Sequence, residues 1–164
     1  MADEQHLTPS EAMRANTRWH GHIKSILLND TEPNSGQDAT ESDREQSAYL
    51  SYVMTALTFI VVEHFAGERP GLEQISYLVK TLREQESDAG RPFDRAKAHI
   101  VIQAALNEDE QSPTLPTETE AIEAGHHVLW ALAASTPGIA ADVGRIMGDI
   151  DRAHQIGTSN TQAG

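Results

Sequence analysis

The chain has 164 residues, with no cysteine, 25 acidic and 12 basic residues, and a formal net charge of −13 at pH 7. A chain of this length can form one domain with a substantial core. The missing cysteines exclude a disulfide scaffold, a thiolate zinc site and a cysteine nucleophile. Because phosphate groups attract lysine and arginine, the excess of acid argues against nucleic acid or an anionic membrane as the main partner.

The acidic residues gather toward the two ends of the chain. Residues 1–47 contain five more acids than bases and residues 108–164 contain seven more, whereas residues 48–107 contain one more. Such acidic ends either attract a basic protein partner or keep the protein in solution.

Residues 1–7 are polar and predicted to be disordered, and the N-terminus has no apolar segment typical of a signal peptide. Together with the lack of cysteine, this predicts a cytoplasmic location.

The first predicted helix runs from Pro9 to about Leu28. Thr8 and Glu11 have the spacing of a capping box, and proline is favoured at the first helical position. Residues 29–42 after it are polar and rich in helix breakers, which predicts a flexible link. The length of this link leaves open whether the first helix packs on its own bundle or on that of a second copy.

The most hydrophobic segment is the second predicted helix, about residues 44–66. It begins after Ser42, which forms a second capping box with Glu45, and ends at Gly67. No residue between Ala48 and Val62 is charged. Apolar residues cover about two thirds of the circumference, which is typical of a helix enclosed by others. The run is shorter than the roughly 20 apolar residues that cross a membrane.

Apolar stripes and helix-start signals predict four more helices. Their predicted bounds are 71 to about 86, 92 to 107, 117 to 135, and 137 to about 155, with a link at 108–116 and a disordered tail at 156–164. Ile100 to Ile102 could form a short strand instead, but the flanking alanines favour a helix. The predicted fold is therefore an all-α, single-domain bundle, residues 8–155, of five or six helices around the central hydrophobic helix.

The chain lacks the short motifs of common serine hydrolases, nucleotide-binding proteins and zinc proteases. Two carboxylate–histidine pairs stand out, because di-metal helical bundles combine two such i, i+3 pairs with glutamates from other helices. The candidate metal ligands are Glu63, His64, Glu123, His126, Asp151 and His154. The alternative interpretation is that these histidines are hydrogen-bonded in the core or lie at helix ends. No catalytic residue and no cofactor is predicted.

The histidines also give a prediction about stability. His126 falls on the inward face of its helix, so acid would have to charge a buried imidazole, and stability should depend on pH between about 5 and 7. His20 and His22 resemble a metal-binding pair. Residues two apart on a helix diverge by about 200°, however, so these two imidazoles should not hold one ion.

Two uncharged strips are candidate interfaces. One, on the central helix, consists of Ser51, Thr55 and Thr58; the other, on the last helix, consists of Ala140, Gly144 and Gly148. Small residues let two helices approach closely, either within the chain or between two copies.

Three functions follow from the sequence. The leading hypothesis is a non-enzymatic, acidic helical interaction module that binds a protein partner or a second copy of itself. The alternatives are a metal-binding bundle, and a DNA-binding regulator with a helix-turn-helix at about 68–105.

Overall fold

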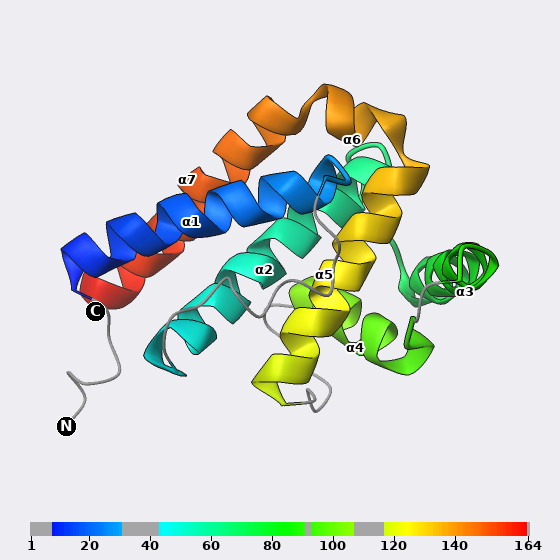
Figure 1. Cartoon of the computed structure of the whole chain (residues 1–164), viewed down its shortest axis with the longest axis horizontal. Coiled ribbons are helices and arrows are strands. Elements are labelled where there is room, and N and C mark those ends of the chain that lie inside the picture. The colour runs from blue at the N-terminus through cyan, green and yellow to red at the C-terminus, as the bar shows by residue number, and fades with distance from the viewer. Residues whose placement is uncertain (1–7, 31–42, 91–92, 107–116, 164) are drawn as a thin grey trace.

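The computed structural model describes residues 8–30, 43–90, 93–106 and 117–163, and within these ranges the chain is helical without any strand. The predicted all-α bundle is confirmed (Figure 1). The helices are α1 (Pro9–Leu27), α2 (Asp43–His64), α3 (Leu72–Asp88), α4 (Arg95–Leu106), α5 (Glu118–Ser135), α6 (Pro137–Ala141) and α7 (Val143–Ala163). None of these described helices is both long and apolar enough to cross a membrane.

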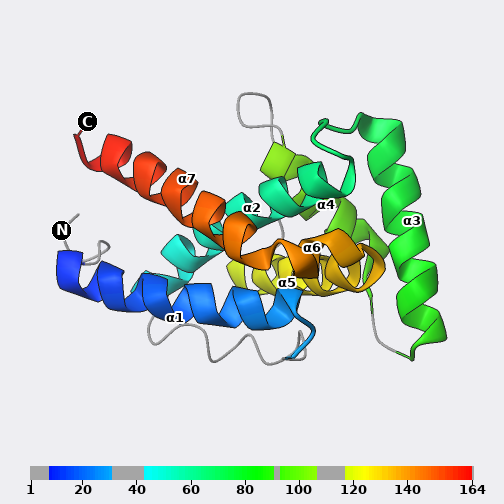
Figure 2. The ribbon, with the colours of Figure 1, turned by 90° about the horizontal axis from the view of Figure 1, so that it is seen from above.

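The most extensive helix contact joins α2 to α5. α2 also packs against α1, α4, α6 and α7, and α5 also packs against α1, α3, α4 and α6. Tyr49, Tyr52, Leu57 and Ile60 of α2 are fully buried. Figure 2 shows α3 at one end of the molecule, where it packs against α4 and α5. The core therefore lies around two neighbouring helices, and α3 keeps a broad outer face.

Some of the helix ends lie where the sequence predicts them. The Thr8–Glu11 capping box is complete, because each residue's backbone N–H donates to the other's side chain at 3.1 and 3.2 Å. α2 ends near the predicted stop, where Gly67 has a left-handed φ of +93° and its N–H donates to the Val62 carbonyl at 2.9 Å. Ser42 lies outside the described residues, and the Glu45 carboxylate accepts from the Arg18 and Trp19 side chains of α1.

The prediction of one continuous last helix, from 137 to about 155, is wrong, because the structure divides this segment into α6 and α7. The break falls at Asp142, where φ is −107° and ψ is 19°. The Asp142 N–H still donates to the Gly138 carbonyl, and its own carbonyl accepts from Ile146, both at 3.0 Å. The backbone bonds therefore continue through a change of direction, visible in Figure 1, that returns α7 along α1 and α2. Glycines on both sides, at 138 and 144, make this bend inexpensive.

Other boundaries differ from the prediction, by about three residues at the start of α4 and about eight at the end of α7. α4 begins at Arg95 rather than at Pro92, because Asp94 caps it by accepting the Lys97 N–H at 3.0 Å. α7 continues to Ala163, through residues 156–163, where the sequence predicts a tail. Extending an existing helix costs far less than starting one, which lets α7 pass Gly157. The predicted disordered residues 1–7, the link 108–116 and all but the first two residues of the link 29–42 lie outside the described residues.

Candidate functional site

Four buried or half-buried rings meet where α1, α2 and α7 come together. The Trp19 ring centroid lies 5.7 Å from that of Tyr49 and 5.7 Å from that of Tyr52. The His154 imidazole of α7 stands edge-on to Tyr52 at 5.2 Å and to Trp19 at 6.1 Å. We call Trp19, Tyr49, Tyr52 and His154 the aromatic cluster. It joins the two helices that lie at opposite ends of the chain to the central part of the bundle.

A buried carboxylate satisfies the polar edge of Trp19. Glu45 is only 4 % exposed, and its Oε1 accepts from Trp19 Nε1 at 2.8 Å and from the Arg18 guanidinium. A carboxylate removed from water is costly unless it is paired and hydrogen-bonded. Glu45 therefore fixes the position of α1 on α2 through two neighbouring side chains.

The two tyrosine hydroxyls of the cluster reach different helices. Tyr52 Oη donates to Asp151 Oδ1 of α7 at 2.6 Å, and Asp151 Oδ2 lies 2.6 Å from His20 Nδ1 of α1. Tyr49 Oη lies 2.6 Å from Nε2 of the fully buried His126 of α5. Burial raises the pKa of both tyrosines, and the Asp151 carboxylate adds to the effect at Tyr52, so both phenols stay protonated at neutral pH.

The six candidate metal ligands do not come together. Glu63 forms a 3.0 Å ion pair with Arg145, and His64 Nδ1 lies 2.8 Å from Thr136 Oγ1 near the start of α6. His126 bonds Tyr49 in the core, whereas Glu123, one turn earlier on α5, is exposed. Asp151 and His154 are the pair that shares surroundings, at the aromatic cluster. Among the described residues no group of three or more histidines and carboxylates could hold a metal ion.

The predicted divergence of His20 and His22 agrees with the structure. His20 faces α7, where it pairs with Asp151, and His22 faces α5, where its ring centroid lies 5.3 Å from that of His126. Trp19 and Ile23 are buried between them. Each histidine of this pair therefore positions α1 against a different helix.

Stability is expected to fall as the pH drops below about 6.5. Burial lowers the pKa of His154, His64 and His127 in the folded protein, so between the lowered values and the ordinary histidine value the unfolded chain binds more protons. The stability is present above about pH 6.5 and is lost as the pH falls toward the folded pKa values. Urea unfolding at pH 8, 7, 6 and 5 measures this directly. Equal stability at pH 8 and pH 5 would contradict it, and His154→Gln should reduce the slope.

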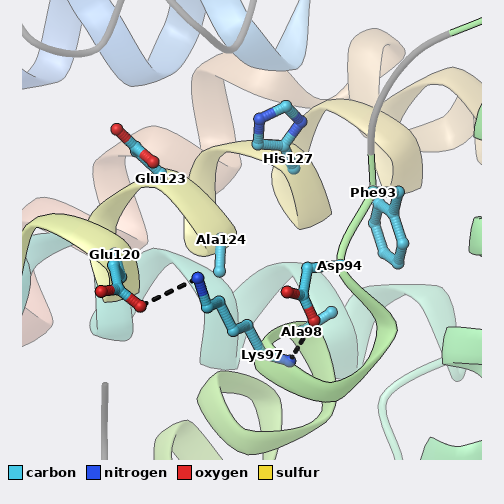
Figure 3. A pocket seen from close by; sticks show the side chains of 8 residues that line it. All are labelled: Phe93, Asp94, Lys97, Ala98, Glu120, Glu123, Ala124 and His127. Carbon is cyan, nitrogen blue, oxygen red and sulfur yellow. Dashed lines mark hydrogen bonds and ion pairs between the residues drawn. The ribbon is translucent and has the colours of Figure 1, made fainter. Parts of the chain in front are cut away.

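A pocket of about 250 Å³ opens between the start of α4 and the N-terminal half of α5 (Figure 3). It is lined by Phe93, Asp94, Lys97, Ala98, Glu120, Glu123, Ala124 and His127. Lys97 Nζ of α4 and Glu120 Oε2 of α5 form a 2.8 Å ion pair across it. Each partner favours the charged form of the other, which raises the pKa of Lys97 and lowers that of Glu120. Of the predicted site residues, only Glu123 lies here.

The two candidate interface strips differ in what covers them. On α2, Ser51 is exposed and Thr55 partly exposed, whereas Thr58 Oγ1 donates to the Ala105 carbonyl of α4 at 2.8 Å and belongs to an internal helix contact. Ala140 and Gly144 are exposed, and a Cβ added at Gly144 would meet no atom within 4 Å. The break at Asp142 places these two residues on different helices, so the second strip is not one helix face.

Sequence reasoning missed the aromatic cluster and the pocket, since both combine residues far apart in the chain. Trp19, Tyr49 and Tyr52 were visible only as inward apolar positions. Two positions carried a signal: His154 was a candidate metal ligand, and the Glu45 carboxylate lies on the same side of α2 as Tyr49 and Tyr52. No family model matches the chain, and no curated protein or solved structure matches it. The fold and the charge therefore define it as an acidic all-α bundle.

Proposed function

We propose that this chain is a non-enzymatic interaction module that binds a protein partner along the outer face of α2. The proposal rests mainly on one line of residues that are at least partly exposed, which we call the α2 stripe. Its members follow one another at intervals of three or four positions and are Ala48, Ser51, Thr55, Phe59 and Val62. Ser51 is exposed and the other four are partly exposed.

The composition of the α2 stripe is unusual for a solvent-facing helix surface. Such surfaces normally carry charged residues, yet α2 has none between Gln46 and Val62. The centres of protein interfaces are depleted in charge and enriched in aromatic residues, as at Phe59. Contiguous uncharged surface of this kind is typical of interaction sites.

Helices α4 and α7 pack against α2 on either side of the α2 stripe. Thr58 on one side bonds the Ala105 carbonyl of α4, and Tyr52 on the other side bonds Asp151 of α7. A helix laid along the stripe would therefore run between α4 and α7. An amphipathic helix with its apolar face toward α2 is the kind of partner that such a surface would take.

The charge of the protein indicates the kind of helix. A net charge of −13 attracts a basic partner over long range and repels an acidic one. We therefore expect an amphipathic helix with an apolar face and flanking lysine or arginine residues.

Binding can be measured with a synthetic helical peptide that carries leucine and alanine on one face and lysines beside it. We expect Ser51→Arg to weaken binding by at least about tenfold, since it places bulk and positive charge on the α2 stripe. Ser76→Arg on the outer face of α3 is the matched control, because it makes the same change at another exposed helical serine. Equal affinity of the two variants, or equal binding of a peptide with glutamates in place of the lysines, would contradict the proposal.

Self-association is the second form of the proposed function. The contact between two copies would include Ala140 and Gly144, which are exposed and which no other described helix covers. Sedimentation velocity tests it: a dimer that Gly144→Arg dissociates and Ser51→Arg does not would assign the seam to α6 and α7. If the protein stays monomeric at high concentration, self-association is excluded, and binding of a basic protein partner remains as the proposed function.

A further inference from the structure

The two ring nitrogens of His20 have different surroundings. Nδ1 lies 2.6 Å from Asp151 Oδ2, across the contact between α1 and α7. Nε2 makes no hydrogen bond with a described residue and is not enclosed by the protein. The side chain as a whole is 34 % exposed. One nitrogen is therefore held by a carboxylate, and the other is open to solvent.

Asp151 decides which nitrogen of His20 carries the proton. Its Oδ1 accepts from the Tyr52 hydroxyl at 2.6 Å, and burial raises the pKa of Tyr52, so that this phenol stays a donor. An ionised carboxylate only accepts hydrogen bonds, so His20 Nδ1 must be the donor to it. In the neutral ring the lone pair then lies on Nε2. A carboxylate placed in this way orients an imidazole for reaction and stabilises the positive charge that the ring gains.

The open side of His20 has donors on both sides along α1. Asn16 and Lys24 lie four positions before and after it, and residues four apart are neighbours on a helix surface. Neither side chain forms a hydrogen bond or an ion pair with a described residue. A Cβ at Gly21, the next residue, would meet nothing within 4 Å. The surroundings of Nε2 therefore suit an anionic group, whereas the Asp151 charge lies on the Nδ1 side of the ring.

We propose that His20 Nε2 is a phosphoryl acceptor, which takes its phosphoryl group from a donor of the phosphoramidate class. The Nε2 lone pair attacks phosphorus, the P–N bond of the donor breaks, and the donor nitrogen leaves as ammonia with the protons that it already carries. The phosphorylated ring is a cation that keeps its Nδ1–H toward Asp151, so the carboxylate stabilises the product. Asn16 and Lys24 donate to the phosphoryl oxygens. This site is separate from the α2 stripe and does not depend on the proposed function.

The probe is potassium phosphoramidate, added to the full chain at pH 8, and the reaction is followed by intact mass and phosphorus NMR. We expect a gain of one phosphoryl group that acid removes and base does not, as for a P–N bond, and peptide mapping should place it on His20. His99 of α4 is the internal control, because it is also partly exposed and has no hydrogen bond or ion pair with a described residue. His20 should react at least about tenfold faster than His99.

Asp151→Asn tests the positioning role of the carboxylate. The asparagine can still accept from Tyr52, but its amide donates to Nδ1 of His20 and so moves the ring proton to Nε2. Nitrogen NMR of the ring should show this change of tautomer, and the rate should fall roughly ten- to hundredfold. Asp149→Asn is the matched control, because it removes the same charge from α7 at a residue that pairs with arginines of its own helix. It should leave the tautomer and the rate unchanged.

Circular dichroism verifies that both variants fold, and the comparison of His20 with His99 needs only the parent chain. Equal rates at these two histidines, or no P–N product, would overturn the proposal. A rate in Asp151→Asn equal to that of the parent chain, with the tautomer changed, would do the same.

Discussion

Replacing Trp19 with alanine should lower the free energy of unfolding by about 3–5 kcal/mol, the range for a large buried aromatic. The indole is 2 % exposed and contacts Tyr49, Tyr52 and His154, so its removal leaves a cavity where three helices meet. It also takes one hydrogen-bond donor from the buried Glu45 carboxylate. Chemical denaturation monitored by circular dichroism measures the change.

Two variants separate the contributions to the Trp19 effect. Trp19→Phe keeps an aromatic ring and loses the Nε1 donor, so it should cost about 1–3 kcal/mol. Tyr77→Ala removes an aromatic side chain that is 73 % exposed on α3 and should change stability by no more than about 0.5 kcal/mol. If Trp19→Ala proved no more harmful than Tyr77→Ala, α1 would not be anchored through the aromatic cluster.

The same glycine-to-alanine substitution should have opposite effects at two positions. A Cβ at Gly125 of α5 would lie 2.6 Å from Val53 Cγ1 and 3.5 Å from Leu57 Cδ1 of α2. Valine has one strongly preferred rotamer in a helix, so the overlap must be relieved by moving the helices. We expect Gly125→Ala to destabilise the protein by about 1–3 kcal/mol, the usual range for an overfilled core.

Gly21 of α1 is the control for this effect, because a Cβ there would meet nothing within 4 Å. Gly21→Ala should stabilise the protein by about 0.5–1 kcal/mol, since alanine is the better residue inside a helix. Thermal melts of the two variants, measured side by side, give the sign of each change. Stabilisation by Gly125→Ala would mean that α2 and α5 do not approach as closely as the structure shows.

Much of the fold could be predicted because the local signals agree with the final packing. The Thr8–Glu11 capping box and the proline after Thr8 define the start of α1, and the periodicity of α2 defines its buried face. The prediction failed at Asp142, where the local pattern is helical on both sides. The direction in which α7 leaves α6 depends on its contacts with α1 and α2, which no local pattern contains.

The candidate site was less predictable than the fold. His126 was correctly placed in the core, but the partner that it bonds, Tyr49, is 77 positions away along the chain. Glu123 was paired with His126 by spacing, whereas the structure places it at the pocket with His127. A position on a helix tells which way a side chain points, and only the packing of α4 against α5 tells what it meets.

The most direct test of the proposed function is an NMR footprint of the lysine-flanked helical peptide on the isotopically labelled protein. Binding along the outer face of α2 predicts the largest shift changes at Ala48, Ser51, Thr55, Phe59 and Val62, with smaller ones at the flanking turns of α4 and α7. The changes should vanish in Ser51→Arg and persist in Ser76→Arg. Shift changes confined to the acidic residues of other helices, with α2 unaffected, would contradict the account.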